Sequence, residues 1–342
     1  MDTREFNRLM KYAFMNDDPY GVLGAIYDNE LPHPYFNPKN IGFSKLRSFD
    51  HNVWLEREKS NRTIVFEDLE YIIPGEEFIW HATGTPPCTE KDLLVTSSIT
   101  TKDHLWPCKY AFSSWHLVQT NMANKDTFVD QPHKRPYFAD ILLGQLKPHR
   151  KIFYDLLKTT GQVENNLVNV FKEYTTPFIE QGQGDIDLFF KQSIDTNTTK
   201  MFQGKFASQY ISKHVQEATW ISVVAETLYH DKIFFPTEKT GKALMSGKPF
   251  IILSSKDFLK NLRSIGFKTF HPIIDESYDE IGDLQERIKS AFNSFLELQK
   301  HDQQMVRLHL KDILDHNERC MRNKLWLTRN ARSMLDPLAT IV

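Results

Sequence analysis

Residues 219–270 have the sequence TWISVVAETLYHDKIFFPTEKTGKALMSGKPFIILSSKDFLKNLRSIGFKTF. The apolar run from Trp220 to Ala225 has the length of one buried strand, and residues 250–253 form a second such run. Between them, Thr237-Glu238-Lys239 predicts a helix start with Thr237 as the N-cap, and Gly247-Lys248-Pro249 predicts its end. Strand, turn, helix and strand in this order are typical of a parallel α/β sheet.

Four charged side chains fall where such a sheet binds ligands, beyond the carboxyl ends of its strands. Glu226 ends the first strand, and Glu238, Lys239 and Lys242 lie at the start of the helix. A lysine offers phosphate a flexible positive charge, and a carboxylate can accept hydrogen bonds from the two hydroxyls of a ribose. The pattern favours a nucleotide-sugar pocket. Its alternatives are an ordinary helix start, and a buried salt bridge from Glu226 to Lys239 or Lys242.

The composition is that of a globular protein with no overall attraction to nucleic acid. The 342 residues are 40% hydrophobic and 25% charged, and the formal net charge is −2. The length predicts two domains. Three widely spaced cysteines indicate neither a metal site nor a disulfide framework. The N-terminus lacks a signal-peptide pattern, and the apolar runs are shorter than the roughly 20 residues that span a bilayer. We therefore expect a cytoplasmic protein without a membrane partner.

A second candidate site lies upstream, where a predicted strand over 137–143 turns into a helix that continues through Lys158. Arg150 lies in the first turn of that helix, where the partial positive charge of the helix end favours anions. The remaining predicted strands cover 63–66, 78–81, 93–97, 110–118 and 167–171, and the remaining predicted helices cover 4–15, 205–216, 281–299 and 302–322.

Residues 174–204 are polar and have little periodicity, which predicts an insertion or a loop between two lobes. They contain Asp185-Ile186-Asp187. An Asp-x-Asp motif holds a metal ion and a sugar diphosphate in one class of glycosyltransferases, but no apolar strand precedes it here. The loop reading is therefore preferred, and a metal-dependent GT-A transferase using Asp185 and Asp187 is the alternative.

The pattern ISVVAET…FFPTEKTGKALMSGKPFIIL resembles the donor-binding signature of the family-10 fucosyltransferase type. In that signature an acid closes a strand, Thr-Glu-Lys opens a helix, and a proline precedes the next strand. The continuation over 258–281 and the upstream segment HRKIFYDLLKTTGQV are similar to glycosyltransferases encoded by tailed bacteriophages. The resemblance covers about residues 137–290.

The resemblance implies an α/β, GT-B-like fold of two Rossmann-type lobes with parallel sheets and a helical C-terminal segment. We expect an acceptor-side lobe over 1–136, a donor lobe over 137–318, and a helix over 319–342 that returns toward the first lobe. Glu238 would bind the ribose, and Lys239 and Arg150 the diphosphate, with Thr237 and Lys242 beside them. Glu226 would lie at the donor sugar or brace the site. The nucleotide-sugar is a co-substrate, and no cofactor or essential metal is expected.

The catalytic base is not identified by the resemblance, because the Glu-(Ser/Asn)-x-Pro-like loop that carries it in the fucosyltransferase type is absent from this sequence. A carboxylate or histidine must deprotonate the acceptor hydroxyl in an inverting transfer. The candidates are His81, which ends a predicted strand before a Gly-Pro loop, and Glu67, Asp68 and Asp140.

The acceptor is open between two classes. One is a hydroxymethylated pyrimidine base in double-stranded phage DNA, a DNA modification in the host cytoplasm, for which basic residues would supply the contact surface. These are Lys134, Arg135, Lys147 and Lys151, and the residues from Arg319 to Arg332. The other is a surface glycan. A non-catalytic nucleotide-sugar-binding protein is a further alternative, and the protein is expected to be a monomer or homodimer.

Overall fold

The computed structural model describes residues 135–170, 210–231 and 233–323 in full, together with positions 117, 120, 121 and 124. Elsewhere it describes only the backbone of short strands. The chain divides into two compact units, one of residues 1–115, 232–235 and 324–342, and one of residues 116–231 and 236–323. None of the described helices is long and apolar enough to cross a membrane.

The second unit is built on a four-stranded parallel sheet with the order β11-β10-β5-β6. Its strands are β5 (Tyr137–Gly144), β6 (Leu167–Val170), β10 (Thr219–Ala225) and β11 (Phe250–Leu253). After β5 the chain forms β6 on one side of β5. It then forms β10 on the opposite side of β5, and β11 beyond β10. The sheet is therefore Rossmann-like, and its topological switch point lies between β5 and β10.

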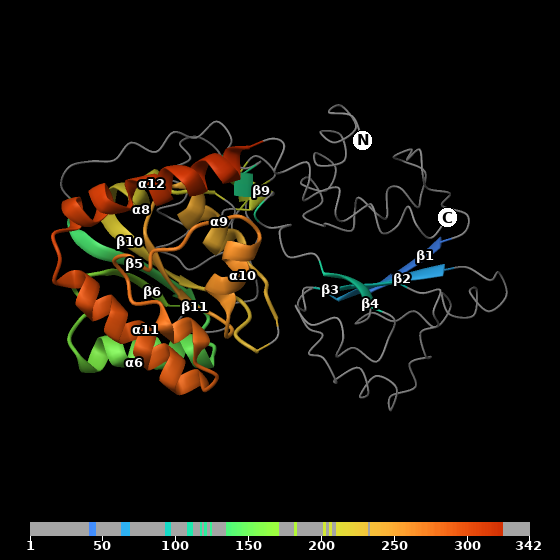
Figure 1. Ribbon diagram of the computed structural model, residues 1–342, viewed down its shortest axis with the longest axis horizontal. Coiled ribbons are helices and arrows are strands. Elements are labelled where there is room, and N and C mark those ends of the chain that lie inside the picture. The colour runs from blue at the N-terminus through green and yellow to red at the C-terminus, as the bar shows by residue number, and fades with distance from the viewer. Residues whose placement is uncertain are drawn as a thin grey trace. The chain divides into compact units, whose positions relative to one another are not determined.

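Helices cover both faces of this sheet (Figure 1). Figure 1 shows α6 (Pro148–Thr159) and α11 (Leu284–Gln299) on one face, and α8 (Lys213–Ala218), α9 (Glu238–Met245) and α12 (Gln303–Arg322) on the other. On the first face, the ring of Phe153 packs edge-on against Phe292 and Phe295, with centroids 5.3 and 5.7 Å away. Because both faces are covered, the central strands read as continuous apolar runs.

The chain leaves β11 into α10 (Phe258–Ser264) and then a 3-10 helix, η5 (Ser277–Glu280). The Asp279 carboxylate accepts hydrogen bonds from the backbone N–H groups of Leu259, at 2.8 Å, and Lys260, at 3.0 Å. These bonds satisfy two N–H groups at the start of α10, whose own N-cap residue makes no side-chain cap.

Gly247 follows the last residues of α9 and forms the turn that leads to β11. Its φ of 61° lies in the left-handed region, and the Lys248 N–H bonds the Ala243 carbonyl at 3.3 Å, which is a Schellman ending. The turn places Lys248 two residues before the start of β11, with its side chain fully buried. The predicted helix end at Gly247 and the predicted N-cap at Thr237 are thereby confirmed.

The predicted strands over 137–143, 167–171, 220–225 and 250–253 are confirmed, as are the long helices over 281–299 and 302–322, to within a few residues at their ends. The helix predicted over 205–216 begins too early, because Ser212 caps α8 and the backbone at 205–206 is a strand. The strand predicted over 78–81 and the helix predicted over 4–15 lie outside the described residues.

The strand predicted over 110–118 is wrong at Leu117, which is helical, and the described strand there, β4, ends at Ala111. The helical positions 117, 120, 121 and 124 are buried and follow a helical period that the neighbouring aromatic residues concealed. Asn121 Nδ2 donates to the Met321 carbonyl at 2.8 Å, and Asn124 Oδ1 accepts from the Ile211 N–H at 2.7 Å. This segment therefore packs with α12 in the second unit.

The first unit contains a backbone sheet of four parallel strands in the order β1-β2-β3-β4. These are β1 (Ile41–Lys45), β2 (Thr63–Asp68), β3 (Leu93–Thr96) and β4 (Cys108–Ala111). The predicted strands over 63–66 and 93–97 correspond to β2 and β3. In the second unit, the short strands β7 (Gln181–Gly182), β8 (Met201–Phe202) and β9 (Lys205–Phe206) form a small separate sheet.

Candidate functional site

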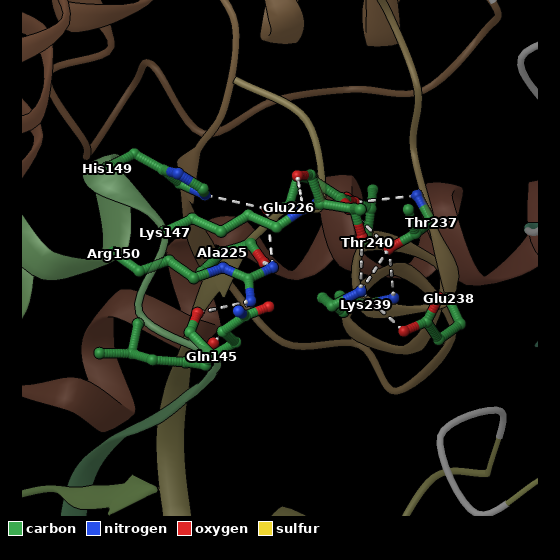
Figure 2. Close-up of polar contacts among 12 residues, drawn as sticks. Gln145, Lys147, His149, Arg150, Ala225, Glu226, Thr237, Glu238, Lys239 and Thr240 are labelled. Atoms are coloured by element: carbon green, nitrogen blue, oxygen red, sulfur yellow. Dashed lines mark hydrogen bonds and ion pairs between the residues drawn. The ribbon is translucent and has the colours of Figure 1, made fainter. Parts of the chain in front are cut away.

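The loops after β5 and β10 meet at the topological switch point, on the carboxyl edge of the sheet. Figure 2 shows side chains from the start of α6 and from the start of α9 converging on the end of β10. In open α/β sheets this edge is the usual position of a ligand site. The polar contacts here form two groups, one around backbone carbonyls and one around a buried carboxylate.

Arg150, in the first turn of α6, joins the ends of β5 and β10. Its Nη1 donates to the carbonyls of Leu143 and Gln145 at 2.7 and 3.2 Å. Its Nη2 donates to the carbonyls of Ala225 and Glu226 at 3.0 and 2.9 Å. The side chain is buried, and this burial lowers its pKa, an effect that the Glu226 carboxylate opposes. The guanidinium thus satisfies four carbonyls where two strands end, and its Nε is buried with no partner among the described residues.

His149 reaches the same carbonyl as Arg150. Its Nε2 lies 2.9 Å from the Glu226 oxygen, and because a carbonyl only accepts, Nε2 carries the proton. The ring is fully buried and stacks on Tyr229 with centroids 4.6 Å apart. Burial, aided by the neighbouring Arg150 cation, lowers the pKa of His149 to about 3. The imidazole is therefore neutral, and within the described part of the chain no donor reaches its buried Nδ1.

The Glu226 carboxylate is fully buried and is held by hydroxyl and amide groups. It accepts from the Thr237 N–H at 2.9 Å, from the Thr237 hydroxyl at 2.5 Å and from the Thr240 hydroxyl. Among the described residues it forms no ion pair, so the salt bridge to Lys239 or Lys242 considered from the sequence is not the explanation. Glu226 instead binds the first turn of α9 to the end of β10.

The Lys239 ammonium lies at the centre of the second group. It donates to Glu238 Oε1 at 2.8 Å, to the Thr237 hydroxyl at 3.0 Å and to the Thr227 hydroxyl at 3.2 Å. Lys239 and Glu238 are partly exposed, at 29% and 18% of their side-chain surface. The structure therefore brings the predicted ribose ligand and the predicted phosphate ligand into direct contact with each other.

Lys242 lies one turn further along α9 and is half-buried. Within the described part of the chain, no hydrogen bond or ion pair involves its ammonium. Burial lowers the pKa of Lys242 to about 8, although the Glu238 carboxylate opposes the shift. Lys242 is thus a desolvated cation near an acid–lysine pair, and an anion there would stabilise its charged form.

Lys147, the N-cap residue of α6, connects the two groups. Its Nζ donates to the Thr227 carbonyl at 2.9 Å, while the Thr227 hydroxyl accepts from Lys239. Thr227 is consequently bound by one lysine from each helix start. Two lysines from separate helices, joined through one residue, suit a ligand with two phosphates.

Asp140 lies away from this edge, in the first half of β5. Its Oδ1 accepts from Lys248 Nζ, the Thr219 hydroxyl and the Ser222 hydroxyl, each at 2.9 Å. It pairs in register with Ser222, four residues before Glu226. The Lys248 side chain is fully buried. In this unit Asp140 therefore neutralises a buried lysine, and the predicted role as catalytic base gains no support from its position.

The other predicted bases lie beyond the part of the chain in which side chains are described. His81 is outside the described residues, as are Asp185 and Asp187, and for Glu67 and Asp68 only the backbone of β2 is described. In the described residues there is no cluster of three histidine, cysteine, aspartate or glutamate side chains that could hold a metal ion.

Three residues at the edge were missed from the sequence as site residues: His149, Thr227 and Thr240. His149 precedes Arg150 in the helix start, so its position carried a signal. Thr240 lies one turn after Thr237, which places both hydroxyls on one side of α9. Thr227 had no signal beyond following Glu226, because its role depends on two lysines from other segments.

Comparison of the sequence with known protein families finds no matching family model, and comparison with curated proteins finds no match either.

Proposed function

We propose that the protein is a nucleotide-sugar-dependent glycosyltransferase with a GT-B-like arrangement of two Rossmann-type lobes. The second unit would be the donor lobe, and the first unit, which contributes a parallel sheet of its own, the acceptor-side lobe. The donor would lie across the switch point between β5 and β10, over the starts of α6 and α9.

The observation that carries this proposal is the grouping of Glu238, Lys239 and Lys242 on one helix start at the switch point. Lys239 and Lys242 would neutralise the diphosphate, and the N-terminus of α9 would assist them. Glu238 would accept the ribose hydroxyls. Glu226 and Arg150 would be positioning residues, because their polar atoms are bound to α9 and to strand-end carbonyls.

The acceptor hydroxyl would be deprotonated by a residue other than the described acids at the sheet of the second unit. In the second unit the described acids at the sheet are engaged: Glu226 by two threonines and Asp140 by Lys248. His149 is neutral, fully buried and bound to a carbonyl. His81 is the first candidate to test. The protein would need no metal ion, since two lysines would carry the charge of the leaving diphosphate.

The acceptor is not assigned by the described surface. Of the basic residues considered for DNA, Arg135 is buried and donates to the Thr219 carbonyl, and Lys147 bonds the Thr227 carbonyl. Lys151 is exposed and pairs with Asp155 at 2.5 Å. These three residues thus contribute less to a DNA-binding face than their sequence positions suggested. Hydroxymethylated pyrimidines in DNA and glycan hydroxyls are both acceptors to test.

Titration calorimetry with UDP-, GDP- and CMP-sugars tests the donor site. We expect at least one to bind wild-type protein and Glu238→Ala or Lys239→Ala to weaken it about tenfold or more, the scale of one charge-assisted hydrogen bond. Glu297→Ala, which removes an exposed acid from α11, is the matched control. If no nucleotide-sugar binds, or if both variants bind as wild type does, the proposal is wrong.

Radiolabel transfer from the bound donor then separates enzyme from binding protein. Hydroxymethylated DNA, unmodified DNA and a panel of glycans serve as acceptors, each with and without EDTA. Transfer that persists in EDTA supports the metal-free mechanism, whereas loss in EDTA favours the metal-dependent alternative with Asp185 and Asp187. Donor binding without transfer or hydrolysis would favour a non-catalytic binding protein.

A further inference from the structure

The Lys239 ammonium has no N–H left for a ligand in this structure. A lysine ammonium carries three N–H donors, and three protein oxygens lie 2.8 to 3.2 Å from Nζ. A phosphate oxygen can therefore bind Lys239 only by replacing one of these acceptors. The acceptor that is replaced determines which protein group becomes available to the ligand.

The two hydroxyl acceptors are held in place by other parts of the unit. The Thr237 hydroxyl donates its hydrogen to Glu226 Oε2 at 2.5 Å, so its lone pairs face Lys239. The backbone of Thr227 is bound on both sides, by Lys147 Nζ at its carbonyl and by Glu226 Oε2 at its N–H, at 2.9 and 3.3 Å. The Thr237 hydroxyl is thus oriented by the buried carboxylate, and the Thr227 backbone is held by that carboxylate and by Lys147.

The third acceptor, the Glu238 carboxylate, is negatively charged and belongs to the first residue of α9. It lies at the partly exposed side of the group and competes directly with a phosphate for the same cation. A carboxylate that leaves Lys239 can turn both of its oxygens toward a pair of hydroxyl hydrogens. The acid best suited to a ribose diol is therefore the one that occupies the phosphate-binding lysine (Figure 2).

We propose that the Glu238–Lys239 ion pair is the resting state of the donor site and that the donor opens it by exchange. The diphosphate takes the place of Glu238 on Lys239, and the released Glu238 carboxylate accepts the ribose hydroxyls, while Thr227 and Thr237 keep the ammonium in position. The inference rests on the proposed function. It adds selectivity: a ligand with a diphosphate but no ribose breaks the ion pair and offers no hydroxyls to Glu238.

Inorganic pyrophosphate and nucleoside 5′-diphosphates are the probes that separate the two halves of the exchange. Removing the carboxylate frees Lys239, so Glu238→Ala and Glu238→Gln are expected to bind pyrophosphate roughly two- to fivefold more tightly than wild type, the range of a partly exposed ion pair. Nucleoside diphosphates lose the ribose contact, so Glu238→Ala is expected to bind UDP, GDP or CDP at least fivefold more weakly.

A double-mutant cycle shows whether the gain in pyrophosphate affinity depends on the Glu238–Lys239 ion pair. In a Lys239→Ala background, Glu238→Ala is expected to give no gain in pyrophosphate affinity, because no lysine is left to release. A general reduction of negative charge would give the gain in both backgrounds. Glu238→Gln retains the side-chain shape, and melting temperatures of all variants confirm that they fold.

Calorimetry on the full chain decides between the outcomes. Tighter pyrophosphate binding that requires Lys239, together with weaker nucleoside diphosphate binding, supports the exchange. Unchanged or weaker pyrophosphate binding in both Glu238 variants overturns it, as does an equal gain without Lys239. If the wild-type protein binds pyrophosphate but no nucleoside diphosphate or nucleotide-sugar, the proposed function is wrong. The pyrophosphate affinities of the variants then still test whether Glu238 competes for Lys239.

Discussion

Arg150 Nη2 lies 2.9 Å from the carbonyl oxygen of Glu226, and His149 Nε2 lies at the same distance from that oxygen. One backbone carbonyl is thus fixed by two side chains of α6, while the carboxylate of the same residue fixes the start of α9. Glu226 therefore connects two helix starts across the end of β10, the place where the donor is proposed to bind.

Arg150→Lys is expected to destabilise the fold, because a lysine supplies three donors from one atom and cannot reach four carbonyls on two strands. The loss should be about 2–4 kcal/mol in the free energy of unfolding, since buried carbonyls are left without partners. Urea denaturation measures it. Lys151→Ala, at an exposed position of the same helix, is the control. A fully stable Arg150→Lys that only loses donor affinity would instead make Arg150 a direct phosphate ligand.

His149 is expected to make the fold sensitive to acid. Its pKa is lowered from an ordinary 6.5 to about 3, so between these values the unfolded chain binds a proton that the folded chain does not. Stability should therefore fall as the pH is lowered through this window, by at most about 1.4 kcal/mol per pH unit. In His149→Gln this contribution disappears, while an amide can still donate to the Glu226 carbonyl.

Denaturation midpoints at pH 7 and pH 5 test this expectation for wild type, His149→Gln and the exposed control His301→Gln. The loss between the two pH values should be smaller in His149→Gln than in the other two proteins. Equal losses in all three would show that His149 is not the acid-sensitive group.

Asp140→Asn is expected to lower the stability by about 3 kcal/mol, because it leaves Lys248 buried without its counter-ion. Lys248→Met in the same background should recover part of this loss, since both members of the pair are then neutral. Thermal and chemical denaturation of the two single variants and the double variant measure the coupling. A catalytic base would behave differently: Asp140→Asn would then abolish sugar transfer and leave the stability unchanged.

Lys242 should give donor binding a dependence on alkaline pH. Its pKa of about 8 means that the free site loses a positive charge as the pH rises through 8, so the affinity for a nucleoside diphosphate should fall above that value. In Lys242→Met the affinity at pH 7 should be lower and the decline above pH 8 weaker. Calorimetry at pH 7, 8 and 9 measures both effects, with Lys289→Met, on α11, as the control. A decline that is as steep in the variant as in wild type would exclude Lys242 as its cause.

The order of β5, α6, β10, α9 and β11 in the second unit could be predicted because each of these elements carries a local signal. Apolar runs marked β5, β10 and β11, Thr237 marked a helix start, and Gly247 marked its end. These signals depend on side-chain burial and backbone conformation within a few residues. The position of Glu226 at the carboxyl edge followed from them, and so did its proximity to α9.

The partners of the charged side chains were decided by the tertiary structure. The sequence placed Arg150 at a helix start, but only the approach of β10 to β5 brings four carbonyls around its guanidinium. The register of these two strands places Asp140 opposite Ser222, four residues before Glu226. The turn after Gly247 then brings Lys248 to Asp140, although the two residues are 108 positions apart in the sequence. Local patterns determine where a charge lies on its element, whereas the residue that neutralises it depends on which elements the fold brings together.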